Sequence, residues 1–186
     1  MSAYMNAKPY HVAHVVPDLD KAVDRLIAAG IGPAHFIRSI DMRARYRGKI
    51  VDIRVSAAFV VIAGTLTELV MQEAGAPSSF TDFIARHPSG ALHHIAYHSG
   101  DFAKTIAAAS EKGRKLIPHM EYIDQEGNDF ESYFEPEGNP DAVLIQLALP
   151  SPLDPVYDHI REIADAWDGS EPRRNFWSLV PAEFVA

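Results

Sequence analysis

The chain contains one short pattern twice, and this repeat limits the folds open to it. The two copies are His11-Val12-Ala13 with Asp18 and Gly30, and His94-Ile95-Ala96 with Asp101 and Gly113. In both copies the Asp lies seven residues and the Gly nineteen residues after the His. Such a repeat predicts a duplicated supersecondary unit whose copies are related by an approximate two-fold axis. Matched residues then face each other across the axis, so the two histidines are candidate ligands of one metal ion.

Each copy predicts a strand, then a helix, then further strands. The runs 11–16 and 94–98 are short and rich in strand-forming residues. The repeated Asp suits a helix N-cap, and the repeated Gly suits a left-handed residue that ends the helix. Later strands are predicted at 56–62, 65–71, 131–134 and 143–149, with a weaker extended run at 50–54. The predicted fold class is therefore α+β, with two modules closing into one curved mixed sheet around a central cleft.

Two segments lie outside the repeat. Residues 73–91 predict a linker with a short helix at 80–86, and residues 150–186 predict a C-terminal helix and tail. Asp154 is expected to cap that helix, with Pro155 at its first position. Trp167, Phe176 and Trp177 need burial, so this extension is expected over the outside of the sheet or at a subunit contact. The predicted organisation is a first module at 9–72, the linker, a second module at 92–149 and the extension.

Composition excludes several classes of partner. The net charge of −8 argues against a nucleic-acid or anionic-membrane surface and favours a small-molecule partner. No apolar run is long enough for a membrane span, and residues 1–9 show no apolar signal core. Cysteine is absent, which excludes disulfides and thiolate ligands. We therefore expect a cytoplasmic protein.

Four residues form a candidate metal site. One polar residue interrupts the last apolar strand of each module, Glu68 in the first and Gln146 in the second. An uncompensated buried polar group costs about 2–7 kcal/mol, so each needs a partner. Together with His11 and His94 they offer two imidazoles and two oxygens, a set suited to zinc, nickel, cobalt, manganese or iron. The alternative is that each histidine forms hydrogen bonds within the core and that Glu68 pairs with an arginine.

Further polar residues are candidates for substrate binding. Basic residues cluster between residues 38 and 49 of an otherwise acidic chain, and include Arg43, Arg45 and Arg47. They could clamp a substrate carboxylate or the phosphates of coenzyme A, or could form a solvated basic loop. His98 lies on the same strand face as His94 and either lines the cleft or packs within the fold.

Four segments within residues 9–149 match a known family. They are His11-Val-Ala-His-Val-Val-Pro-Asp18, Thr67-Glu68-Leu69-Val70, His93-His94-Ile-Ala-Tyr97 and Val143-Leu-Ile-Gln146-Leu. The chain thereby resembles the vicinal oxygen chelate superfamily, which includes glyoxalase I, methylmalonyl-CoA epimerase, extradiol dioxygenases and bleomycin-resistance proteins. It is most similar to the epimerase and glyoxalase-like branch. The resemblance implies paired βαβββ modules around a metal-binding cleft, a homodimer, and ligand positions at the four residues of the candidate site.

The resemblance also implies a chemistry. Isomerases and lyases of this kind stabilise the enolate of a carbonyl or acyl-CoA substrate on a metal ion while a carboxylate moves the proton. Family isomerases carry Glu where this chain has Gln146, and a glutamine cannot act as a general base. Glu68 is then one catalytic candidate. Asp52 lies near the position of the other family carboxylate and is the second candidate, or an exposed loop acid.

Two other classes stay open. An Fe(II) ring-cleaving dioxygenase would use His11, His94 and one carboxylate as ligands. A binding or sequestration protein of the bleomycin-resistance kind would have no catalytic role. The sequence leaves open the substrate, the metal, and whether the modules pair within one chain or across a dimer.

Overall fold

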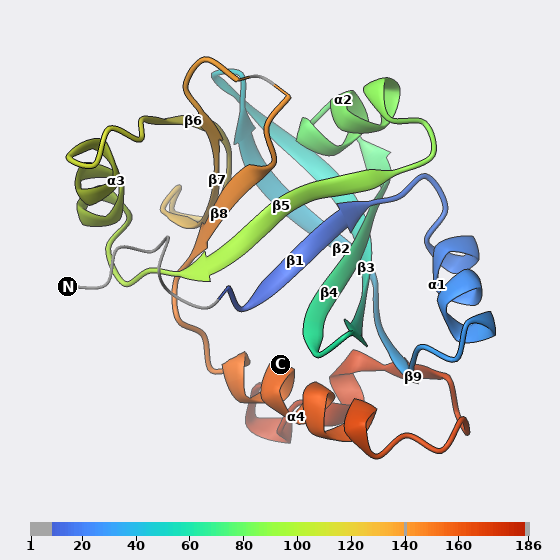
Figure 1. Cartoon of the computed structure of the whole chain (residues 1–186). Coiled ribbons are helices and arrows are strands. Elements are labelled where there is room, and N and C mark those ends of the chain that lie inside the picture. Colours follow the sequence, from blue (N-terminus) through green and yellow to red (C-terminus); the bar gives the residue numbers. More distant parts are fainter. Residues whose placement is uncertain (1–8, 140, 185–186) are drawn as a thin grey trace.

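The chain folds as an α+β protein with one curved mixed sheet (Figure 1). The computed structural model describes residues 9–139 and 141–184. Most of the segment 1–9, in which the sequence predicted no signal core, therefore lies outside the described residues. Within the described part, four α-helices surround the sheet. None of these helices is both long enough and apolar enough to cross a membrane.

Each copy of the repeat forms a βαβββ module. The first comprises β1 (His11–Val15), α1 (Leu19–Ala28), β2 (Ala34–Tyr46), β3 (Lys49–Ile62) and β4 (Thr65–Gly75). The second comprises β5 (Ala91–His98), α3 (Phe102–Ser110), β6 (Leu116–Ile123), β7 (Asp129–Pro136) and β8 (Leu144–Ala148). Helix α2 (Ser79–Arg86) lies between them, and α4 (Asp154–Asp165), β9 (Arg173–Asn175) and the short helical turns Phe176–Leu179 and Ala182–Phe184 follow.

The two modules pair within one chain. Strands β1 and β5 are antiparallel neighbours at the centre, β1 is parallel to β4, and β5 is parallel to β8. The full strand order is β3-β4-β1-β5-β8-β7-β6-β2-β9, and β2 also pairs with β3. Because β2 contacts both β3 and β6, the curved sheet closes on itself. The cleft expected between the modules is therefore the interior of this closed sheet.

The repeated Asp and Gly residues mark the helix ends, as predicted. Asp18 and Asp101 each accept a hydrogen bond of 3.0 Å from a backbone N–H in the first turn of α1 and α3. Gly30 and Gly113 have φ angles of 77° and 72° after the same helices. These four residues are thus explained by local backbone requirements.

The start of α4 differs from the prediction. Leu153 is the N-cap residue and Asp154 is already helical, so the predicted cap at Asp154 was wrong by one position. The Asp154 carboxylate accepts from the backbone N–H of Ser151 at 3.1 Å, outside the helix. Because the Asp154 carboxylate makes this hydrogen bond before the helix, it does not cap the first turn of α4 as predicted.

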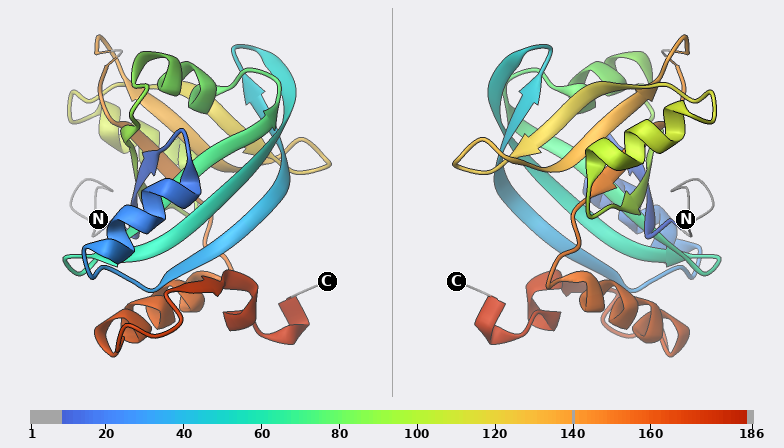
Figure 2. Two further views of the ribbon diagram at one scale, coloured as in Figure 1. Left: turned by 90° about the vertical axis from the view of Figure 1, so that its right-hand side faces the viewer. Right: turned by 90° about the vertical axis from the view of Figure 1, so that its left-hand side faces the viewer.

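The C-terminal extension closes one end of the curved sheet, as both views in Figure 2 show. Phe176 and Tyr157 contact the ring of Phe59 on β3, with centroid distances of 5.6 and 5.1 Å. Phe59 belongs to the interior cluster, which also contains Phe80 of α2, whereas α1 and α3 cover the outer face. Of the two expected positions, the one over the outside of the sheet was therefore wrong, and a subunit contact stays a prediction.

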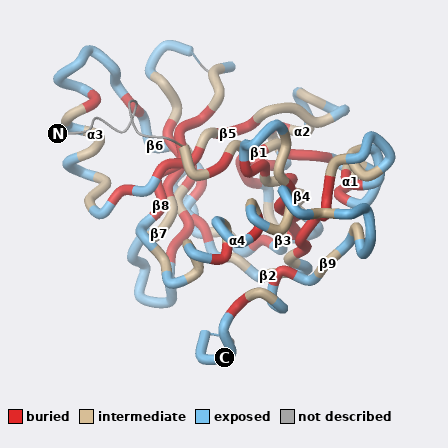
Figure 3. Tube along the Cα trace, turned by 60° about the horizontal axis from the view of Figure 1, so that its bottom comes forward, coloured by how far each residue is buried: buried red, intermediate tan, exposed pale blue. Residues whose placement is uncertain are grey.

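Buried residues concentrate on the strands (Figure 3).

The buried histidine of β2 predicts a pH-dependent stability. His35 is 0% exposed, and burial, followed by the charge of Arg174, lowers its pKa from 6.5 to about 4. The unfolded chain therefore binds this proton at higher pH than the folded chain, and the unfolding free energy falls as the pH falls from 6.5 towards 4. The loss from this group is up to about 3 kcal/mol.

Urea unfolding at about pH 7 and about pH 4.5 checks this expectation. The variant His35→Leu should lose less unfolding free energy between the two pH values than the wild type, whatever its stability at neutral pH. His87→Gln, at the end of α2, serves as the control and should keep the wild-type pH dependence. Equal losses in wild type and His35→Leu would contradict the prediction.

Candidate metal centre

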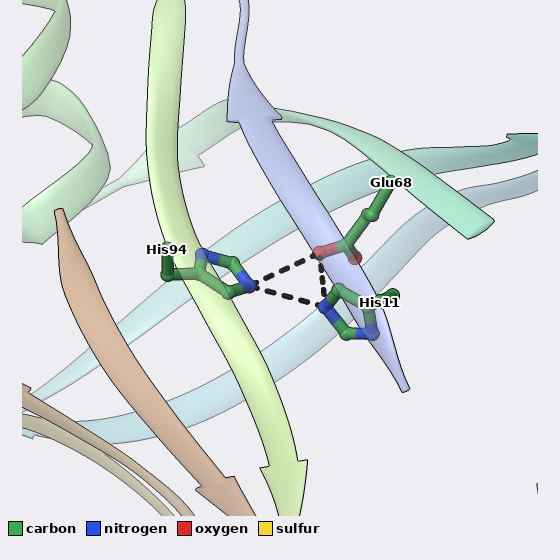
Figure 4. A group of neighbouring side chains, drawn as sticks. All are labelled: His11, Glu68 and His94. Carbon is green, nitrogen blue, oxygen red and sulfur yellow. Dashed lines mark hydrogen bonds and ion pairs between the residues drawn. The ribbon is translucent and has the colours of Figure 1, made fainter. Parts of the chain in front are cut away.

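Three strands bring His11, Glu68 and His94 together (Figure 4). Ala13 of β1 pairs with Glu68 of parallel β4 and with His94 of antiparallel β5, so the three side chains converge on one point of the interior. Glu68 Oε2 lies 3.5 Å from the Nε2 atom of each histidine. The two Nε2 atoms lie 3.2 Å apart. One ion could contact all three ligand atoms after small side-chain shifts.

The electrostatics of this cluster suit a metal site. His94 and His11 are 0% and 3% exposed, and the side chain of Glu68 is 15% exposed. Burial raises the pKa of Glu68, but its contacts with the two histidines outweigh this effect and hold the pKa below its usual value. Burial also lowers the pKa of His94. An ionised carboxylate beside a neutral imidazole is the state in which both bind a divalent ion.

Gln146 occupies the two-fold equivalent of Glu68. It pairs with Ala96 of β5, as Glu68 pairs with Ala13 of β1. Its Nε2 donates to Glu131 Oε2 at 2.9 Å and lies 3.1 Å from the Tyr133 hydroxyl. Its Oε1 is buried and has no hydrogen-bond partner among the described residues. This orphaned acceptor is an oxygen that a bound ion would satisfy.

Glu131 on β7 is a site residue that the sequence reasoning missed. It lines the same cavity as Glu68. Burial, followed by the negative charge of Glu68, raises the pKa of Glu131 to about 8, against the hydrogen bond from Gln146. The spacing offered a signal, because Glu131 lies fifteen residues before Gln146 and Asp52 lies sixteen before Glu68. Applying the search for a second carboxylate to both modules would have found it.

The cavity beside the cluster is small and largely apolar. Its volume is about 140 Å³. Four tyrosine side chains line it together with aliphatic and phenyl groups, and burial raises the pKa of all four above the usual value. They are therefore neutral and can donate hydrogen bonds to a bound molecule. The lining residues are Tyr10, His11, Ile37, Ile40, Met42, Val55, Ala57, Phe59, Glu68, Val70, Phe80, Tyr122, Glu131, Tyr133, Gln146 and Tyr157.

Asp52 lies outside this cavity. Ile53 and Val55 of β3 belong to the interior cluster, so the alternation of side chains along the strand directs Asp52 to the opposite face. Its side chain is 77% exposed and accepts a hydrogen bond of 3.2 Å from Arg43 Nε. The structure thus places Asp52 at the surface, as the alternative interpretation has it, although on strand β3 and not in a loop.

The other predicted substrate-binding residues also lie away from the cavity lining. The cluster with Arg43 and Arg45 is part of strand β2, whose alternate residues point inwards, and not of a loop. Arg45 pairs with Glu121, and Arg47 pairs with Asp82 at 2.8 Å. His98 stacks on Tyr10 with a centroid distance of 4.2 Å, so it contacts a residue that lines the cavity but does not line the cavity itself. The cavity is lined by none of the four predicted residues Arg43, Arg45, Arg47 and His98.

Comparisons with known proteins agree with the resemblance seen in the sequence. A family model described as Glyoxalase/Bleomycin resistance protein/Dioxygenase superfamily matches residues 10–134. No curated protein matches the chain. Similar solved structures include methylmalonyl-CoA epimerase from Mycobacterium tuberculosis, with 19% identity, coverage of 76% of this chain and 87% of that chain, and a TM-score of 0.43.

Two further structures are similar to this chain. A hypothetical protein from Bacillus halodurans C-125 has 18% identity, with coverage of 77% of this chain and 94% of that chain and a TM-score of 0.49. A mutant of 4-hydroxymandelate synthase from Streptomyces coelicolor has 12% identity, with coverage of 77% of this chain and 49% of that chain and a TM-score of 0.45.

Proposed function

Since the chain belongs to the glyoxalase/bleomycin resistance/dioxygenase superfamily, we propose that it is a metal-dependent enzyme of the isomerase or lyase type. It acts on a small carbonyl compound by stabilising its enolate. One observation carries this proposal: His11 and Glu68 of the cluster with His94 line one cavity together with a second carboxyl group, Glu131. A site that both holds a cation and moves a proton needs these two parts.

The donor set fits a divalent metal ion. His11 Nε2, His94 Nε2 and Glu68 Oε2 would hold the ion, and the unpartnered Gln146 Oε1 offers a further oxygen. Two imidazoles with carboxylate and amide oxygens suit zinc, nickel, cobalt, manganese or iron. When bound, the ion supplies a Lewis acid that polarises a substrate carbonyl.

In this proposal Glu131 takes the role of base, for which the sequence offered Asp52 as a candidate. Its carboxyl group lines the cavity and is held by the amide of Gln146, which orients it. In the proposed reaction Glu131 removes the proton from the carbon next to the substrate carbonyl and later returns it. The tyrosine rings around the cavity keep water away from the reacting carbon and offer hydroxyl groups to substrate oxygens.

The cavity favours a small substrate over an acyl-CoA. Its volume of about 140 Å³ accommodates only a few non-hydrogen atoms next to the cluster. The larger hollow of about 970 Å³ beside it carries the carboxylates of Asp41, Asp52 and Asp124. Its two arginines are already paired with Asp41 and Asp52. This balance of charge does not suit the phosphates of coenzyme A.

A second candidate function has its own support. Two histidines and one glutamate are the ligand set of many Fe(II) oxygenases, in which open positions on the ion take up substrate and oxygen. The cluster of His11, His94 and Glu68 has this composition. An Fe(II) dioxygenase acting on a small aromatic compound is therefore the alternative.

Isotope exchange separates these functions. The metal-loaded protein is incubated in deuterium oxide, without oxygen, with a panel of small ketones, aldehydes and 2-oxo acids. We expect deuterium to enter the carbon next to the carbonyl, as measured by mass spectrometry, and His94→Ala should abolish this exchange. Oxygen uptake with catechols by the Fe(II) form, without such exchange, would support the dioxygenase instead. Metal binding with neither reaction would favour the sequestration alternative.

A further inference from the structure

A row of hydrogen-bonding side chains leads from His94 to the surface. His94 Nδ1 lies 2.9 Å from His93 Nδ1, and His93 Nε2 lies 3.0 Å from Ser79 Oγ. Ser79 Oγ lies 3.0 Å from His119 Nε2, and His119 Nδ1 lies 3.4 Å from Glu135 Oε2. His93 and Ser79 are each 2% exposed, whereas the side chain of Glu135 is 29% exposed. The row therefore joins the buried cluster to solvent.

Two β-bulges place the histidines of this row. Residues His94 and Leu92 of β5 pair with consecutive residues of β1, so His93 is the extra residue of a bulge. In the same way Pro118 and Met120 of β6 pair with consecutive residues of β7, and His119 is the extra residue. A bulge redirects a side chain that strict alternation would turn to the other face. This explains how neighbouring His93 and His94 can meet through their Nδ1 atoms.

The carboxylate of Glu135 at the outer end determines which atom donates and which accepts in each hydrogen bond of the row. Glu135 can only accept, so His119 carries its hydrogen on Nδ1 and accepts at Nε2 from the Ser79 hydroxyl. Ser79 then accepts from His93 Nε2–H, and His93 Nδ1 accepts from His94 Nδ1–H. All donors and acceptors of the row are matched in this arrangement. Its consequence is that His94 Nε2, the atom that faces Glu68, has no hydrogen and can bind an ion.

The contact between the two ligand histidines agrees with this direction. His11 Nε2 and His94 Nε2 lie 3.2 Å apart, so one of them must lack a hydrogen. His11 Nδ1 is buried and has no partner among the described residues, so nothing there favours a hydrogen on Nδ1. In the metal-free protein His11 therefore donates from Nε2 and His94 accepts, as the row requires.

Ser79 is a link in this row and not a nucleophile. Together with His119, which contacts both Ser79 and Glu135, these side chains resemble a catalytic triad in composition. However, Ser79 is 2% exposed, and the cavity beside it measures about 20 Å³, which is room for about one water molecule. No substrate could reach its hydroxyl group.

We propose that His93, Ser79, His119 and Glu135 form an outer relay that holds His94 in its metal-binding tautomer and thereby sets the metal affinity of the site. The proposal rests on the proposed function in that His94 is taken as a metal ligand. The four residues are positioning residues, since none of them contacts the ion position directly. Outer partners of metal-bound histidines typically contribute 10- to 100-fold in affinity.

Metal affinity of Ser79 variants tests the relay. We expect Ser79→Ala to bind Zn²⁺ or Co²⁺ about 10- to 100-fold more weakly than wild type in competition with a chromophoric chelator. Ser79→Thr restores the hydroxyl, has the neighbouring cavity for its methyl group, and should return the affinity to within about threefold of wild type. Ser78→Ala removes the adjacent hydroxyl, which caps α2. It should destabilise the helix but leave metal affinity unchanged, which separates the relay from a loss of folding.

A spectroscopic measurement on the metal-free protein tests the relay independently of metal binding. With ¹⁵N-labelled histidine, long-range ¹H–¹⁵N spectra should show hydrogens on His94 Nδ1 and His93 Nε2 in wild type. Glu135→Gln, a half-buried substitution that leaves the core intact, should weaken this preference. A hydrogen on His93 Nδ1, or unchanged metal affinity in Ser79→Ala, would overturn the relay. Failure of the wild type to bind any divalent ion, with the expected tautomers present, would overturn the proposed function alone.

Discussion

Replacing Glu68 with glutamine is expected to lower divalent metal affinity by about 100-fold or more, since even outer partners of metal ligands contribute 10- to 100-fold. The substitution keeps the size of the side chain but removes the negative charge that lies 3.5 Å from both Nε2 atoms. The two histidines would then have to hold the cation with neutral partners alone. Titration with Zn²⁺ against a chromophoric chelator, together with the metal content of protein purified without chelator, measures the effect.

A matched control exists on the same strand. Glu73 is exposed, and its carboxylate accepts from the Ser39 hydroxyl at 2.8 Å, away from the cavity. Glu73→Gln should leave metal affinity unchanged. His11→Ala and His94→Ala should behave like Glu68→Gln. Stoichiometric, tightly bound metal in all three of these variants would show that the ion lies elsewhere in the protein.

Replacing Glu131 with glutamine is expected to separate proton transfer from metal binding. The amide oxygen of the new side chain can still accept from Gln146 Nε2, so the geometry of the site should persist. It cannot take up the substrate proton, however, and the loss of a general base costs about 10²- to 10⁴-fold in rate. We expect deuterium exchange to slow by this factor while the metal content stays that of wild type.

Asp52→Asn provides the control for this second experiment. Asp52 is the carboxylate that the sequence offered as a candidate base, with an exposed acid as the alternative, and it lies at the surface with its side chain 77% exposed. The exchange rate of Asp52→Asn should match wild type within about twofold, because an exposed carboxylate outside the cavity cannot reach the substrate carbon. A slow Asp52→Asn variant beside a fast Glu131→Gln variant would reverse the assignment of the base.

The pair of Gln146 and Glu131 shows which part of the site the sequence repeat predicted and which part it did not. In the first module the carboxylate stands on the closing strand, at Glu68, and the corresponding residue of the second module is Gln146. The second module has its carboxylate on the neighbouring strand instead, at Glu131, where it is hydrogen-bonded to Gln146. Each module therefore contributes one carboxylate to the site, but the two carboxylates stand on strands that are not equivalent, which explains the imperfect symmetry visible in the sequence.

The arginine cluster shows what the local sequence could not decide. A run of alternating charged and apolar residues can be an exposed loop or one face of a strand, and residues 34–46 form a long strand. Its interior face carries Met42 and Tyr46, while Arg43 and Arg45 point outwards to Asp52 and Glu121. The carboxylates that neutralise these arginines come from other strands, so their pairing depends on sheet register.

The sequence by itself determined the duplicated modules, the capped helices and the pairing of His11 with His94 as matched residues. These features depend on local backbone requirements and on spacing, which a sequence displays directly. Only the tertiary structure decided which acid shares the cavity and how His93 contacts His94. Those outcomes depend on two bulges and on the closure of the sheet between β2 and β6, which bring together side chains from strands distant in the chain.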